Sequence, residues 1–151
     1  MNETTVSDCK EIKLNQFSGR IGRTSQFGDL IGFPFSAKRI FYLYDIPGGE
    51  SRGAHAHKCC HQFLIAICGS FEVLLDDGKE KRKISLQCPD RGLHIPPGIW
   101  ASEVNFSAGA ICLVMASHLF EESDYIRTYS FFKNYKITNN DSNHYQESDI
   151  E

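Results

Sequence analysis

The chain has 151 residues, of which 41% are hydrophobic and 23% charged, a composition typical of one soluble globular domain. Its formal net charge of -3 excludes the global basic field that attracts nucleic acid or an anionic membrane surface. No run approaches the roughly 20 apolar residues of a membrane-spanning helix, and residues 1–16 lack the apolar centre of a signal peptide. We therefore expect the six cysteines to be reduced thiols in a cytoplasmic protein.

Short apolar stretches alternate with turn-forming residues through most of the chain. We predict ten strands, at Ile12–Phe17, Leu30–Phe35, Arg39–Asp45, Arg52–His57, His61–Cys68, Phe71–Leu75, Lys81–Leu86, Gly92–Ile95, Ile99–Val104 and Ala110–Ala116. The sequence Asp76-Asp77-Gly78 separates two of them and is typical of a hairpin turn, because glycine readily adopts a positive φ. Helices do not alternate with these strands, so the pattern predicts an all-β fold, an antiparallel barrel or jelly roll.

One short helix is predicted near the C-terminus, at Ser123–Tyr135. Ser123 or Asp124 can cap its first turn, and apolar side chains recur at helical spacing after them. We expect a flexible N-terminus over residues 1–11, a single domain over 12–134 and a polar tail over 135–151.

The segment GAHAHKCCHQFLIAICG, residues 53–69, carries the residues best suited to chemistry. His55 and His57 are two residues apart, so both imidazoles project from the same face of a strand. Together with Gln62 and Gly69 they resemble the first motif of the cupin proteins.

A second cupin motif is also recognisable in its spacing, from Pro96-Pro97-Gly98 to Asn105. Two metal-ligand positions of the paired motifs are changed, because Gln62 replaces an acid and Ala101 replaces a histidine. Two neutral imidazoles and an amide supply no anionic ligand, so we predict a site that holds no metal and no other cofactor.

Five segments carry a closer resemblance: KRIFYLYD (38–45), RGAHAHK (52–58), HQFLIAICGSFEVLLDDG (61–78), GLHIPPGIW (92–100) and SDYIRTYSFF (123–132). Over residues 12–134 the chain resembles the sugar-nucleotide 3,4-ketoisomerases, small single-domain cupins that act on dTDP-4-keto-6-deoxyglucose. The resemblance implies a metal-independent isomerase of deoxysugar or amino-sugar biosynthesis. It also implies a homodimer that exchanges N-terminal strands. Many members have a histidine where this chain has Ala101.

The isomerisation moves a carbonyl from C4 to C3, which requires proton transfer through an enediolate. We predict that His55 and His57 are catalytic, since imidazole titrates near neutral pH; which of them is the base stays open. The remaining candidates would bind the substrate: Tyr42, Tyr44, Gln62 and Arg52 as donors to the developing oxyanion, Arg39, Arg52 and Lys58 for the diphosphate, and Trp100 as an apolar platform.

Several of these residues have an equally good structural interpretation. Tyr42 and Tyr44 share a face and could belong to the core or to a dimer interface, and Trp100 could be a core residue. Gln62 could bind a backbone group. At the level of function, a related sugar-nucleotide epimerase, a non-catalytic sugar-binding cupin and a metal-dependent cupin oxygenase are the alternatives.

Overall fold

The computed structural model describes residues 3–27 and 33–144, without the side chains of residues 140–144. The elements are η1 (Val6–Asp8), β1 (Lys10–Lys13), β2 (Asn15–Gly19), β3 (Gly22–Gln26), β4 (Arg39–Leu43), β5 (Arg52–His57), β6 (Gln62–Cys68), β7 (Phe71–Asp76), β8 (Lys81–Leu86), β9 (Arg91–Ile95), β10 (Trp100–Val104), β11 (Ile111–Ala116), η2 (Glu122–Asp124), β12 (Tyr125–Ile126) and α1 (Tyr129–His144).

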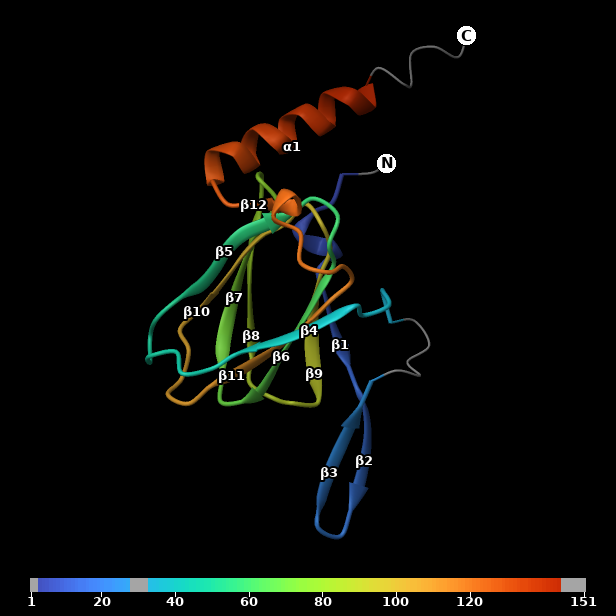
Figure 1. The fold of residues 1–151 in the computed structure, drawn as a ribbon, viewed down its shortest axis with the longest axis vertical. Helices are drawn as coiled ribbons and strands as arrows, with labels where there is room; N and C mark the ends of the chain where they lie inside the picture. Colours follow the sequence, from blue (N-terminus) through green and yellow to red (C-terminus); the bar gives the residue numbers. More distant parts are fainter. Residues whose placement is uncertain (1–2, 28–32, 145–151) are drawn as a thin grey trace.

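Two five-stranded sheets form the body of the molecule (Figure 1). Their strand orders are β1-β9-β6-β11-β4 and β12-β5-β10-β7-β8, and every pairing in both sheets is antiparallel. The expected all-β single cupin domain, a jelly roll with one C-terminal helix, is therefore confirmed. The sheets form an open sandwich, which is the jelly-roll form of that expectation.

The core lies between the two sheets and follows the period-2 alternation of the strands. Leu64 and Ala66 of β6 face Val73 and Leu75 of β7 within one continuous apolar cluster. Along β4 and β5 the inner side chains are only half-buried, among them Phe41, Leu43 and His55. Solvent therefore reaches the space between the sheets along this side.

The predicted hairpin around Asp76-Asp77-Gly78 is confirmed. Strands β7 and β8 pair over their whole length, from Phe71 opposite Leu86 to Asp76 opposite Lys81. Gly78 has a φ of 95°, which a residue with a Cβ would rarely adopt.

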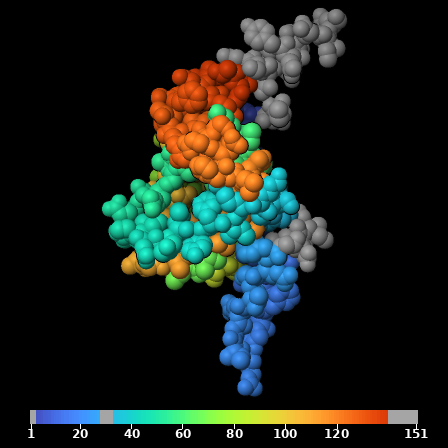
Figure 2. Space-filling model, viewed as in Figure 1, coloured from blue at the N-terminus to red at the C-terminus, as the bar shows by residue number. Residues whose placement is uncertain are grey.

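The N-terminal part differs from the predicted single strand at Ile12–Phe17. That stretch is divided between β1, which pairs with β9, and β2, which pairs with the unpredicted β3. The β2–β3 hairpin projects away from the body of the molecule (Figures 1 and 2). Of the predicted strand Leu30–Phe35, residues 30–32 lie outside the described residues, and residues 33–35 form no strand. Within the stretch expected to be flexible, Val6 and Cys9 are buried in the core.

The helix begins at Tyr129, six residues later than predicted. Its expected first turn is occupied instead by η2 and by β12, whose Tyr125 and Ile126 pair with the edge of β5. The helix also runs on to His144, through part of the expected tail. Lys136 is buried and donates to the carbonyls of Thr4 and Gly98, which holds this part of the helix against the body.

Within the described residues, no helix is long and apolar enough to cross a membrane. The six cysteines, all of which lie in the described part of the chain, form no disulfide.

Candidate functional site

The two histidines of RGAHAHK lie side by side on the inner face of β5. Ala56, between them, faces outward and is buried with Ile126 and Phe132 beneath α1. Alternation then directs His55 and His57 between the sheets. We call these two residues the inner histidine pair. Their ring centroids are 5.0 Å apart, so one small molecule can contact both rings.

Asp124 holds His57 from the end of η2. Its Oδ2 lies 2.7 Å from His57 Nδ1, and its Oδ1 accepts a hydrogen bond of 2.6 Å from the backbone N–H of Cys59. Burial alone would raise the pKa of Asp124, but the hydrogen bonds from His57 and from the backbone outweigh it and lower that pKa. Asp124 is therefore a carboxylate at neutral pH, and it fixes the tautomer of His57 with the proton on Nδ1.

The other ring nitrogen of His57 points into the protein. Nε2 is buried and has no hydrogen-bond partner among the described residues. Burial lowers the pKa of His57, while Asp124 opposes that shift by favouring the charged ring. A neutral imidazole with an unpartnered nitrogen and a carboxylate on its far side is suited to accept and return a proton.

His55 is oriented by the backbone of its own strand. Its Nδ1 contacts the carbonyl oxygen of Gly53, which leaves Nε2 as the basic nitrogen. Burial and the neighbouring His57 lower the pKa of His55 to about 4, and the Gly53 carbonyl opposes the shift only in part. His55 is consequently a neutral base over the physiological pH range.

Aromatic and cationic side chains border the inner histidine pair. The Tyr125 ring lies 5.0 Å from the His55 ring and 4.3 Å from the His57 ring. The Tyr125 hydroxyl receives a hydrogen bond of 3.3 Å from Arg39, whose Nε is buried and has no partner among the described residues. The Arg127 guanidinium lies 4.3 Å from the centre of the Tyr125 ring. Arg127 is also ion-paired with Glu122, with Nε 2.6 Å from Oε1. The site therefore combines two bases with Arg39 and with this Arg127–Glu122 pair.

Four of the predicted substrate-binding residues lie elsewhere. Tyr42 is on the outer face of β4 and Tyr44 follows the end of that strand, and they are 60% and 58% exposed. Trp100 is on the outer face of β10 and packs against Tyr129 and Phe132 of α1. Arg52 is exposed at the start of β5. The structure does not bring these four residues to the inner histidine pair.

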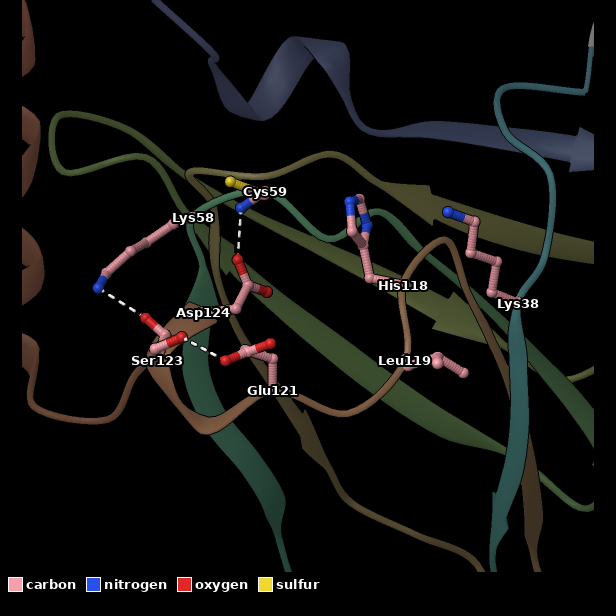
Figure 3. A pocket seen from close by; sticks show the side chains of 8 residues that line it. All are labelled: Lys38, Lys58, Cys59, His118, Leu119, Glu121, Ser123 and Asp124. Atoms are coloured by element: carbon pink, nitrogen blue, oxygen red, sulfur yellow. Dashed lines mark hydrogen bonds between the residues drawn. The ribbon is translucent and has the colours of Figure 1, made fainter.

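Gln62 and Lys58 take different positions. Gln62 is buried at the start of β6 and, by alternation with Leu64, faces the space between the sheets. Lys58 lines a surface pocket of about 540 Å³. Figure 3 shows this pocket, with Lys58 donating to the Ser123 carbonyl and Lys38 and His118 on its opposite side. Asp124 also lines this pocket and is hydrogen-bonded to His57, so it connects the pocket with the inner histidine pair.

One group of side chains brings metal-ligand atoms together. The ligand atoms of His57, Cys60 and Asp124 lie within 4.8 Å of one another. The hydrogen bond between His57 and Asp124 already accounts for the approach of two of them. Of the predicted cupin ligand positions, only His57 belongs to this group, so a metal-independent site stays our prediction.

Sequence reasoning missed the roles of Asp124, Tyr125 and Arg127. Asp124 was interpreted as a helix-capping residue, because the segment was assigned to the helix. The available signal was the short stretch DYIR within SDYIRTYSFF, which the family resemblance already included.

Comparison with known proteins places these features in a family context. The model of the family described as "FdtA: WxcM-like, C-terminal" matches residues 7–137. A TDP-4-oxo-6-deoxy-alpha-D-glucose-3,4-oxoisomerase from Aneurinibacillus thermoaerophilus is 44% identical to this chain over 102 residues, which are 68% of this chain and 73% of that protein.

Solved structures give the same result. A 3,4-ketoisomerase from Helicobacter canadensis is similar with a TM-score of 0.82 and 39% identity, over 85% of this chain and 97% of its own. A His-to-Asn mutant of the 3,4-ketoisomerase QdtA from Thermoanaerobacterium thermosaccharolyticum, solved with TDP-4-keto-6-deoxyglucose, has a TM-score of 0.83 and 32% identity, over 87% of this chain and 96% of its own.

Proposed function

We propose that this chain, a member of the family described as "FdtA: WxcM-like, C-terminal", is a sugar-nucleotide 3,4-ketoisomerase. It converts dTDP-4-keto-6-deoxyglucose into a dTDP-3-keto-6-deoxyhexose without a metal. The observation that carries the proposal is the inner histidine pair, with the Asp124 carboxylate 2.7 Å from His57 and with His55 held as a neutral base.

The roles of the two histidines follow from their partners. His55 Nε2 takes the C3 proton, and the electron pair of the broken C–H bond forms the C3=C4 double bond of the enediolate. The π electrons of the C4 carbonyl move to O4, which then takes up the proton held by His55. The O3 hydroxyl gives its proton to His57 Nε2 as C3 becomes the carbonyl carbon, and the same ring delivers a proton to C4. His57 handles this second transfer, because Asp124 stabilises its protonated form.

A histidine base is weak for this task, since imidazolium has a reference pKa of about 6.5 and a ketone α-proton is far less acidic. The enediolate must therefore be stabilised by donors in a water-poor site. Arg39 donates to Tyr125 beside the inner histidine pair and has a buried Nε without a partner among the described residues. Arg39 and Arg127 also supply positive charge for the substrate diphosphate.

Incubation with dTDP-4-keto-6-deoxyglucose in D₂O, followed by proton NMR, tests this activity. We expect deuterium at C3 or C4 together with formation of a 3-keto sugar. Exchange only at C5 would show an epimerase, and no exchange would show a non-catalytic sugar-binding protein. Loss of turnover with EDTA that one added metal restores would contradict the metal-independent mechanism.

The proposal includes a homodimer that exchanges N-terminal strands. Two features support it: exposed apolar side chains on the outer face of the β4 sheet, with Ile40 and Tyr42 about 60% exposed, and the projecting β2–β3 hairpin (Figure 2). Phe17 and Ile21 on that hairpin are 59% and 99% exposed. A second copy can cover both surfaces.

Light scattering tests the dimer. We expect twice the chain mass for the wild type and a single chain mass for Tyr42→Lys, because a buried lysine would destabilise the interface. The matched control is Glu80→Lys, a charge change in the exposed turn between β7 and β8. A wild-type protein with the mass of one chain would exclude strand exchange.

A further inference from the structure

Strand β10 places a carboxylic acid in the interior, close to the inner histidine pair. Glu103 is 6% exposed and lies two residues after Ala101, so the two side chains project from the same inner face. Ala101 pairs with His55 of β5, and Glu103 pairs on its other side with Val73, a fully buried core residue. The acid is thus surrounded by the core rather than by solvent.

The Glu103 carboxyl group rests directly on Gly53. Any Cβ on Gly53 would overlap the carboxyl oxygens, so only glycine leaves room for this acid. Gly53 also has a φ of 91°, and its carbonyl oxygen orients Nδ1 of His55. Glu103, Gly53 and His55 therefore form one contiguous arrangement on two neighbouring strands.

No cation of the described part of the chain accompanies this acid. Among the residues that the structure describes, Glu103 forms no salt bridge, and its backbone partner Arg52 is exposed. The ionisable groups on the inner faces around it are His55 on β5 and the Cys112 thiol on β11, whose pKa is raised by burial and further by Glu103. Burial raises the pKa of Glu103 to about 7, only partly opposed by its own backbone N–H. Below about pH 7 the protonated form of this carboxyl group therefore predominates.

We propose that protonated Glu103 is a catalytic hydrogen-bond donor to the oxygen that becomes negative when the C3 proton leaves. This role rests on the proposed isomerase function. Ala101 leaves the inner face beside His55 without a polar side chain, and Glu103 lies two residues further along, roughly 6.6 Å in a strand. A sugar ring held against His55 can therefore reach the Glu103 carboxyl group. A neutral carboxylic acid in an apolar site is an effective donor to an enolate-like oxygen.

The donor requirement supports this role. Of the four donors expected from the sequence, Tyr42, Tyr44 and Arg52 are exposed and lie away from the inner histidine pair, and Gln62 alone faces the space between the sheets. An unpaired acid in the core is unfavourable for folding, so its presence next to the reacting groups points to a function rather than to stability.

Two substitutions separate a catalytic role from a structural one. Glu103→Met removes the carboxyl group but keeps an unbranched side chain of similar length. We expect it to raise Tm, more at pH 8 than at pH 5, and to lower kcat about 10²-fold, the usual effect of losing one oxyanion donor. The sign of the pH effect follows from the raised pKa: the acid in the folded wild type costs stability as pH rises through about 7. Glu72→Met, on the adjacent β7, is the matched control and should leave kcat unchanged.

Glu103→Gln is the conservative variant, because its amide still donates a hydrogen bond but cannot ionise. We expect it to retain kcat within about tenfold of the wild type. For the wild type we expect kcat to fall as pH rises through about 7, and Glu103→Gln should lack this fall. In the infrared spectrum, the C=O band of a protonated carboxylic acid should shift when substrate binds to the wild type and be missing in Glu103→Gln.

The outcomes separate the two proposals. A wild-type kcat in Glu103→Met, or a fall of Tm in parallel with kcat in both variants, would overturn the role of Glu103 and leave the isomerase intact. A wild-type protein that converts no substrate in the same NMR assay would overturn the proposed function, and this role with it.

Discussion

The protein contains two pairs of neighbouring histidines with opposite surroundings. The outer histidine pair, His61 and His94, lies on the outer face of the β6 sheet, with His61 Nδ1 2.9 Å from His94 Nε2 and the rings stacked at 5.2 Å. Phe35 lies within 6 Å of both rings. The inner histidine pair has instead the Asp124 carboxylate, a buried nitrogen without a partner and two nearby arginines.

Burial affects both pairs in the same way. It lowers the pKa of His94 to about 4, as it does that of His55. A shifted pKa therefore does not by itself distinguish a catalytic histidine from a structural one. The distinguishing features are a carboxylate that fixes the tautomer and a second nitrogen left for the substrate.

The largest effect that this comparison predicts is on turnover. His55→Asn and His57→Asn should each lower kcat by about 10²-fold or more, because positioned acid–base groups contribute that much to proton transfer. The NMR assay with dTDP-4-keto-6-deoxyglucose measures it. Substitution of His94 by Asn is the matched control and should leave kcat near the wild-type value. Equal losses of kcat from substitutions in both pairs would show that the inner and outer histidine pairs do not differ in function.

A smaller effect is expected at Asp124. Asp124→Asn keeps the size of the side chain but removes the charge that favours protonated His57, so kcat should fall by roughly tenfold or more with little change in KM. Glu121→Gln, a neutralised acid on the same segment, serves as the control. If Asp124→Asn turns over at the wild-type rate, Asp124 only anchors the Cys59 backbone.

The sequence predicted those parts of the fold that local patterns determine. The β7–β8 hairpin follows from alternation on both sides of Asp76-Asp77-Gly78. The common face of His55 and His57 follows from their spacing alone. In these cases the physical cause lies within a few residues of the feature that it determines.

Long-range packing determines what the sequence could not show. Alternation places Tyr42 and Tyr44 on one side of the chain, but only the packed sheets show that Tyr42 lies on the outer face of β4. Trp100 lies outside because α1 covers that face of β10. Asp124 reaches His57 across 67 residues of chain, and this contact, together with the pairing of β12, explains why the helix begins later than predicted.

The smallest expected effect concerns stability in acid. In the unfolded chain His55 and His94 bind protons near pH 6.5, whereas in the folded protein they stay neutral down to about pH 4. The unfolded state therefore binds more protons within this window, so Tm should fall as pH is lowered from about 6.5 to about 4.

His94→Gln can keep a hydrogen bond to His61 but cannot be protonated. This substitution should reduce the fall in Tm by roughly a few °C and leave kcat unchanged. His55→Asn should reduce the fall in Tm as well, but it should also abolish most of the turnover. An unchanged acid profile in His94→Gln would mean that the outer histidine pair is protonated in the folded protein, and the two pairs would then differ in charge as well as in their neighbours.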